Sequence, residues 1–184
     1  RTLKRFVNAK TLGSLIQVPQ EEEAELKVFL DALYRLEQEG DFQQKAAAKA
    51  FIPFIQQAWI LAQRYDAVVA NPPYMGSSSF NPFMSKWVKR NYPDVKSDLF
   101  SSFIVRIMDF AGEHGEVGMM TPFVWMFIGS YEKLRNRLID DKTLTTLIQL
   151  EYSGFAGATV PICTFTYHNS HIDGYKGGYV RLAD

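Results

Sequence analysis

The first third of the chain carries a hydrophobic pattern typical of helices. Apolar residues recur at helical spacing after Pro19 and a run of glutamates that suits the first turn of a helix, and Gly40 closes the stretch. The predicted inner face consists of Leu26, Phe29, Leu30, Leu33 and Leu36. Residues 3–18 alternate only weakly and are expected to form a short strand or a loop.

A second helical pattern runs over residues 41–63, and we expect a kink or a break at Pro53. Its predicted inner face consists of Ala46, Ala50, Phe54, Ala58 and Leu61. Residues 1–64 are therefore predicted to form a mostly helical N-terminal segment.

From residue 65 onwards, short strands alternate with helices. The β-branched run at 66–70 indicates a buried strand, and it ends abruptly in Asn71-Pro72-Pro73-Tyr74. The remaining expected elements are helices over 77–91, from Ser97 or Asp98 to Gly112 or Gly115, and after Ser130 as cap, and strands over 116–121, 144–150, 159–167 and 179–182. This order predicts an α/β fold with a parallel sheet covered on both faces, in which the closing strand pair is antiparallel.

Composition and charge limit the ligands that the chain can bind and the cellular compartment in which it is expected. The 184 residues are 47% hydrophobic, and 20 Lys and Arg balance 20 Asp and Glu, which argues against binding nucleic acid by electrostatics alone. Cys163 has no partner for a disulfide or a metal site, so we expect it in a strand-side core position and in a reducing, cytoplasmic compartment. The most apolar stretch, 117–128, is too short and too interrupted to cross a bilayer, so no membrane segment is expected.

The Asn71-Pro72-Pro73-Tyr74 turn has the composition of a binding site. In an open α/β sheet, ligands bind beyond the carboxyl ends of the strands, which is where this turn lies. Two prolines fix the backbone and remove two N–H donors, so the carbonyls of the turn are left to accept hydrogen bonds. Asn71 adds a side-chain acceptor and Tyr74 an aromatic face. Such a group suits a planar ring that carries an amino group, for example a nucleobase taken out of the DNA stack.

The run from Tyr65 to Tyr74 resembles the signature of the amino-group DNA methyltransferases that use S-adenosylmethionine, which is [Asp/Asn/Ser]-Pro-Pro-[Tyr/Phe/Trp] at a strand end. Segments 97–103, 115–122 and 154–165 resemble, in order, the helix beyond the catalytic loop, the next strand, and the motif whose aromatic residue packs against the flipped adenine. The Asn-Pro-Pro-Tyr form is most similar to the large adenine-N6 methylases of BREX-type phage-exclusion and fused restriction-modification systems.

The resemblance implies direct transfer of a methyl group from S-adenosylmethionine to a flipped adenine, without a metal. Asn71 and the carbonyl of Pro72 would bind the target amino group, Pro73 would help to fix the turn, Tyr74 would stack on the base and Phe155 would flank it. Leu99 and Phe103 would line the adenine pocket of the cofactor, and a plain core role is the alternative for both.

One departure from the family pattern shapes the prediction for the chain as a whole. We find neither the glycine-rich turn that passes the cofactor nor the acidic residue for its ribose upstream of Asn71. The chain is therefore expected to be a fragment in which residues 65–184 form the second half of a Rossmann-like methyltransferase domain. DNA would be bound through a recognition domain outside the chain, and other phage-defence or restriction subunits are candidate partners. Two alternatives stay open: methylation of RNA or of a protein glutamine, and a non-catalytic scaffold domain in a nucleic-acid complex.

Overall fold

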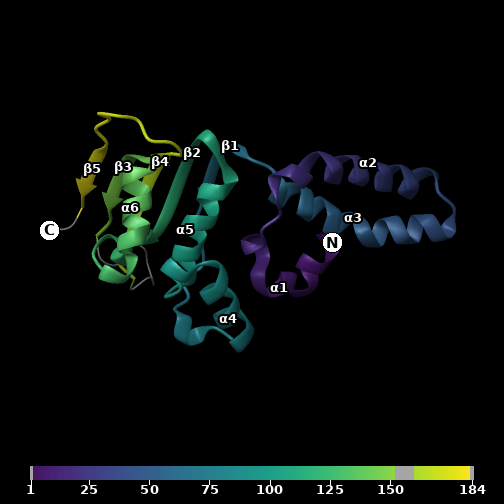
Figure 1. The fold of residues 1–184 in the computed structure, drawn as a ribbon, viewed down its shortest axis with the longest axis horizontal. Helices are drawn as coiled ribbons and strands as arrows, with labels where there is room; N and C mark the ends of the chain where they lie inside the picture. The colour runs from purple at the N-terminus through teal and green to yellow at the C-terminus, as the bar shows by residue number, and fades with distance from the viewer. Residues whose placement is uncertain (1, 152–159, 183–184) are drawn as a thin grey trace. The chain divides into compact units, whose positions relative to one another are not determined.

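The structure is a computed structural model that describes residues 2–151 and 160–182. The chain divides into two compact units, Arg1–Arg64 and Tyr65–Asp184. The first unit is helical (Figure 1). It opens with α1 (Ala9–Leu12) between two 3-10 helices, Thr2–Asn8 and Gly13–Leu15. The strand or loop expected over residues 3–18 is therefore wrong up to Leu15, whereas residues 16–18 form a loop. Phe6, Leu12 and Leu15 are buried, so tertiary packing stabilises these short helices where their weak periodicity does not.

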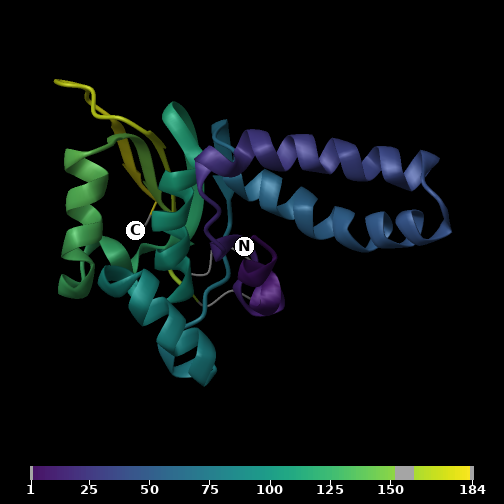
Figure 2. The same ribbon diagram turned by 45° about the vertical axis from the view of Figure 1, so that its right-hand side comes forward.

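The body of the first unit is a pair of helices, α2 (Glu23–Glu39) and α3 (Phe42–Ala62), which run side by side in both views (Figures 1 and 2). A capping box starts α3: Asp41 Oδ1 accepts from the amide of Gln44 at 2.8 Å, and Gln44 Oε1 accepts from the amide of Asp41 at 3.0 Å. The indole of Trp59 donates to Glu23 Oε1 at 2.8 Å and ties the other end of the pair together.

The helix pair differs from the prediction in three details. In α2, Phe29 and Leu36 are exposed, and only Leu26, Leu30 and Leu33 of the predicted inner face are buried. The α3 helix continues through Pro53, so the chain does not break there. Its buried face also differs from the predicted one, because Ala46, Ala50 and Phe54 are exposed and only two of the five predicted residues are buried. The buried residues of α3 are Ala48, Ile52, Ile55, Ala58, Leu61 and Ala62.

The second unit is built on a five-stranded sheet with the order β1-β2-β4-β3-β5. Its strands are β1 (Tyr65–Ala70), β2 (Ala111–Pro122), β3 (Thr143–Gln149), β4 (Ile162–His168) and β5 (Gly178–Arg181). The strand β4 runs antiparallel to both of its neighbours, β2 and β3, whereas β1 pairs with β2 and β5 pairs with β3 in parallel. The antiparallel closing pair is confirmed, and the sheet as a whole is mixed.

The helices of this unit are α4 (Pro82–Asn91), α5 (Leu99–Phe110) and α6 (Glu132–Asp140). The first begins later than predicted because Asn81 caps it and Pro82 occupies its first position. Asp98 caps α5 as expected, but the helix ends at Phe110, before the predicted glycine stop. Ser130 does not cap α6, since it lies inside a 3-10 helix, Gly129–Tyr131, that precedes it.

Within this unit the helices α5 and α6 lie on one face of the sheet (Figures 1 and 2). The strand residues that point to this face form the core, and they include Val117, Met119, Cys163, Phe165 and Tyr167. The position predicted for Cys163 is therefore confirmed. On the opposite face Val69 is 86% exposed, and an apolar hollow of about 330 Å³ extends from Val69 to Thr166. Coverage of both faces is thus not found within the described residues of this unit.

Among the described residues, no helix combines the length and the apolar character that crossing a membrane requires.

Candidate active site

The Asn71-Pro72-Pro73-Tyr74 turn follows directly after β1, at the carboxyl end of this strand. The neighbouring strand β2 ends at the same edge, because Ala70 pairs with Met119 in the parallel register of the two strands. Pro72 is buried, whereas Asn71, Pro73 and Tyr74 are exposed. The turn is thus anchored by one proline and presents its polar and aromatic side chains at the ligand-binding edge of the sheet.

The side chains of Asn71 and Tyr74 converge. The hydroxyl of Tyr74 donates to Asn71 Oδ1 at 2.9 Å and lies 3.3 Å from the carbonyl oxygen of Met120 in β2. Burial raises the pKa of Tyr74, and negative charge on Cys163 would raise it further. The phenol therefore keeps its proton at neutral pH and remains a donor. An amino group that binds Asn71 Oδ1 must displace this hydroxyl or share the oxygen with it.

Aromatic residues support the ring of Tyr74 from one side. The ring of Phe100, which is 1% exposed, meets it edge to face at a centroid distance of 6.4 Å. Phe100 in turn packs against Tyr131 at 6.0 Å. The Tyr74 side chain itself is 38% exposed, so part of the ring remains available for stacking against a planar ligand.

The two residues predicted for the cofactor pocket lie on α5. Leu99 is buried and Phe103 half-buried, and their spacing of four places both on one face of the helix. The amide of Leu99 donates to the carbonyl oxygen of Met75 at 2.9 Å, so the start of α5 is bonded to the residue that follows Tyr74. The structure thus brings the backbone of Leu99 to the turn. Phe155, predicted to flank the base, lies outside the described residues.

Sequence reasoning missed three further contacts near the turn. Asp98 was predicted only as a helix cap, yet its carboxylate also accepts from the amide of Met75. At the end of β2, the hydroxyl of Thr121 accepts from the indole of Trp125 at 3.1 Å and lies 3.8 Å from Cys163 Sγ. Burial raises the pKa of Cys163, which keeps the thiol protonated. The contacts of Asp98 with Met75 and of Thr121 with Cys163 join residues 23 and 42 positions apart, so no local sequence pattern predicts them.

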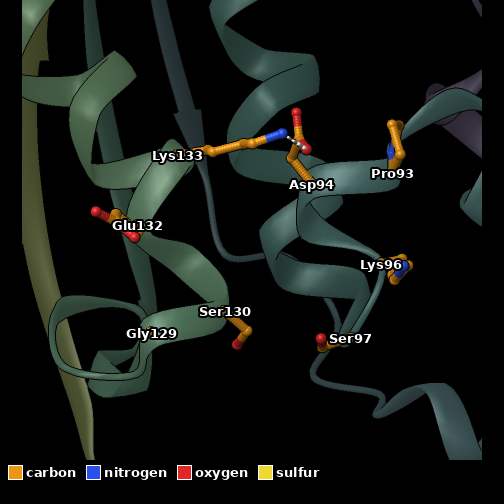
Figure 3. Close-up of a pocket in the computed structure, with 8 residues that line it drawn as sticks. All are labelled: Pro93, Asp94, Lys96, Ser97, Gly129, Ser130, Glu132 and Lys133. Atoms are coloured by element: carbon orange, nitrogen blue, oxygen red, sulfur yellow. Dashed lines mark hydrogen bonds and ion pairs between the residues drawn. The ribbon is translucent and has the colours of Figure 1, made fainter.

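A polar pocket of about 290 Å³ lies between the turn that precedes α5 and the start of α6 (Figure 3). Lys133 Nζ binds Asp94 Oδ1 at 2.7 Å across it, and this hydrogen bond raises the pKa of Lys133. Two lysines and two carboxylates, Lys96, Lys133, Asp94 and Glu132, line the pocket, so their charges cancel. The pocket therefore has no net attraction for a phosphate.

The comparisons with known proteins agree on one family. The model of the Eco57I restriction-modification methylases matches residues 5–155. The chain is 51% identical over 187 residues to the adenine-specific methyltransferase BrxX of Escherichia coli O9:H4 (strain HS), and the match covers 100% of the chain and 16% of BrxX. It is also 34% identical over 127 residues to the adenine-specific methyltransferase PglX of Lacticaseibacillus casei (strain Zhang), covering 67% of the chain and 10% of PglX. The chain thus spans less than a fifth of the length of these relatives.

A solved structure supports the fold class. A Listeria monocytogenes protein assigned to the class I S-adenosylmethionine-dependent methyltransferases superposes with a TM-score of 0.51, over 98% of the chain and 70% of that protein, at 9% identity. The expected methyltransferase type of α/β fold is thereby confirmed. With a family model that matches most of its length and a relative that matches all of it, the chain belongs to the family of Eco57I-type restriction-modification methylases.

Proposed function

We propose that the chain is part of an adenine-specific DNA methyltransferase that transfers a methyl group from S-adenosylmethionine to N6 of a flipped adenine, in phage defence or restriction-modification. Residues 65–184 would supply the second half of the catalytic domain, and residues 1–64 a helical segment before it. The identity to BrxX over the whole chain supports this activity. The observation that carries the proposal is the convergence of Asn71 and Tyr74, with 2.9 Å between the Tyr74 hydroxyl and Asn71 Oδ1, at the carboxyl end of β1.

The chemistry assigned to the turn follows from its acceptors. Asn71 Oδ1 and the carbonyl oxygen of Pro72 each accept one hydrogen of the target amino group, while Pro73 helps to hold the turn in shape. Holding both hydrogens counteracts delocalisation of the nitrogen lone pair into the ring, so the nitrogen becomes a better nucleophile. Both acceptors are carbonyl oxygens, whose partial negative charge stabilises the positive charge that develops on the nitrogen during transfer. Tyr74 stacks on the extruded base, with Phe155 as its expected partner on the other side.

The residues on α5 fit one part of the cofactor. Leu99 and Phe103 share an apolar helix face beside the turn, which suits the flat adenine ring of S-adenosylmethionine. When bound, this cofactor supplies an electrophilic methyl group on a sulfonium.

Partners and location belong to the same proposal. The balanced charge of the chain supports DNA binding through a recognition domain elsewhere in the protein, rather than through a basic surface of these residues. Other subunits of a phage-defence or restriction system are the expected protein partners. A buried, unpaired Cys163 supports a cytoplasmic location.

The first experiment measures transfer of labelled methyl groups from S-adenosylmethionine to duplex DNA by the full-length protein, with N6-methyladenine identified after digestion. Asn71→Ala should lower the rate about 100- to 1,000-fold, comparable to the loss of one stabilising contact in a transition state, while the protein remains folded. Asn81→Ala is the matched control, because this asparagine caps α4 and lies outside the turn.

The outcomes separate the candidate functions. Equal rates for Asn71→Ala and the parent would contradict the assigned mechanism. Label in RNA or in protein glutamine, but not in DNA, would move the activity to those substrates. A folded parent that binds no S-adenosylmethionine would favour a scaffold domain.

A further inference from the structure

Asp98 joins the turn to the helix α5 through one carboxylate oxygen. Its Oδ1 accepts from the amide of Met75 at 3.1 Å and from the amide of Phe100 at 3.2 Å. Met75 directly follows Tyr74, and Phe100 lies in the first turn of α5. The second contact is an ordinary helix cap, whereas the first reaches across to the segment that carries the proposed base-binding residues.

The backbone on both sides reinforces this link. Gly76 and Asp98 form an isolated antiparallel bridge, flanked by the bonds from the Leu99 amide to the Met75 carbonyl and from the Ser77 amide to the Ser97 carbonyl, both at 2.9 Å. The position of Asp98 is itself fixed, because the buried hydroxyl of Ser101 lies 2.7 Å from the Asp98 carbonyl oxygen and 2.8 Å from that of Val95.

The composition of the turn makes this anchor important. Pro72 and Pro73 have no N–H groups, so the turn offers few backbone donors by which the fold can hold it. The amide of Met75 is the donor closest after Tyr74, and Asp98 binds it. A shift at Met75 is passed directly to Tyr74, and through the 2.9 Å hydrogen bond to Asn71.

We propose that Asp98 is a positioning residue that fixes the distance between the base-binding turn and the start of α5, where the residues assigned to the cofactor lie. This inference rests on the proposed function. Methyl transfer requires the amino nitrogen and the methyl carbon to meet in line, and a displacement of about 1 Å can lower such a rate about 100-fold. Asp98 would act through Tyr74 and Asn71 without touching the substrate.

The test uses three variants of the full-length protein and two measurements. Asp98→Ala removes the acceptor, Asp98→Asn keeps an oxygen that can accept both amides, and Asp41→Ala is the control because it removes an aspartate cap of the same kind from α3. Amide hydrogen exchange over residues 72–78 reports on the turn without any substrate. The second measurement determines kcat and KM for methyl transfer to adenine.

We expect Asp98→Ala to speed exchange at the Met75 amide and to lower kcat about 10- to 100-fold. Asp98→Asn should restore most of both properties, and Asp41→Ala should change neither. Unchanged exchange at Met75 in Asp98→Ala would overturn the proposal, as would equal losses of kcat in Asp98→Ala and Asp41→Ala. An Asp98→Asn variant as poor as Asp98→Ala would do so too. If the parent methylates no adenine, the proposed function fails, and the exchange data alone decide whether Asp98 holds the turn.

Discussion

At the scale of single residues, the hydroxyl and the ring of Tyr74 would affect a bound base in opposite ways. Its hydroxyl occupies Asn71 Oδ1, the acceptor proposed for the target amino group, at 2.9 Å. Its ring packs against Phe100, and the residue as a whole is 38% exposed. A base that binds Asn71 therefore competes with the hydroxyl but gains from the ring.

Substitutions at Tyr74 can separate the two contributions. Tyr74→Phe keeps the ring and should bind DNA that contains the target adenine about as well as the parent does. Tyr74→Ala removes the ring and should raise the Kd about 5- to 150-fold, which corresponds to about 1–3 kcal/mol of stacking per base. Fluorescence anisotropy with the full-length protein measures both. The control is DNA with an abasic site at the target position, for which the three proteins should have equal affinities. Equal losses for both variants on intact DNA would assign the effect to the hydroxyl.

The proposed site could be predicted in part because its members lie close together in the sequence. Asn71 to Tyr74 form one turn after a recognisable strand, and Leu99 and Phe103 share a helix face through their spacing alone. The bond from Met75 to Asp98 could not be predicted, because it spans 23 residues and depends on how α4 returns the chain to the turn. Helix capping alone already explains an aspartate at position 98, so the sequence does not reveal that Asp98 also binds the amide of Met75.

At the scale of the elements, the order of the strands in the second unit agrees with the sequence pattern, but β1, which was predicted to be buried, contains no buried residue and exposes Val69. The helices of the first unit agree less well. Strands such as β1 are bounded by sharp breaks in composition, which a local pattern captures. In α3 the alanines and the large apolar residues offer more than one inner face, and only packing against α2 decides between them. Residues 3–18 gave no usable periodicity, and there too the buried contacts define the helices.

Two adjacent residues test which face of α3 is buried. Ile55 is 3% exposed and Phe54 is 43% exposed, although the sequence pattern placed Phe54 on the inner face. Ile55→Ala should lower the free energy of unfolding by about 2–5 kcal/mol, as expected for a buried aliphatic residue, and Phe54→Ala should cost clearly less. Urea unfolding followed by helical circular dichroism measures both. If Phe54→Ala lowered the free energy of unfolding more than Ile55→Ala, the face predicted from the sequence would be the buried one.

At the scale of the whole molecule, a buried phenol at the centre of the sheet links stability to pH. Tyr167 lies in β4, is 0% exposed, and its hydroxyl has no hydrogen-bond partner among the described residues. Burial raises its pKa far above the usual value. Because the unfolded chain loses this proton first, near pH 10, the contribution of Tyr167 to stability is complete below about pH 10 and falls as the pH rises further.

Tyr167→Phe should therefore affect stability in two ways. Removing an unpaired buried hydroxyl should raise the free energy of unfolding at pH 7 by about 1–3 kcal/mol. The loss of stability between pH 7 and about pH 10.5 should also become smaller than in the parent. Thermal unfolding at the two pH values measures both effects, with Tyr175→Phe, whose ring is 49% exposed, as the control at pH 7. A destabilised Tyr167→Phe protein at pH 7 would indicate that the hydroxyl has a partner after all.

The reversed direction of β4 has a consequence for how proteins of this kind can diversify. Since β3 ends and β4 begins at the edge where β1 ends, Gln149 and Ile162 lie at the same edge of the sheet as the carboxyl end of β1. The amide of Leu150 donates to the carbonyl of Ile162 at 3.1 Å, and that of Phe123 to the carbonyl of Pro161 at 3.2 Å, so both positions are fastened to the sheet. Insertions and deletions between these two anchored positions leave the order and the direction of the strands unchanged. Evolution can thus alter the edge of the sheet where we propose that the substrate binds, while the hydrophobic core keeps its sequence.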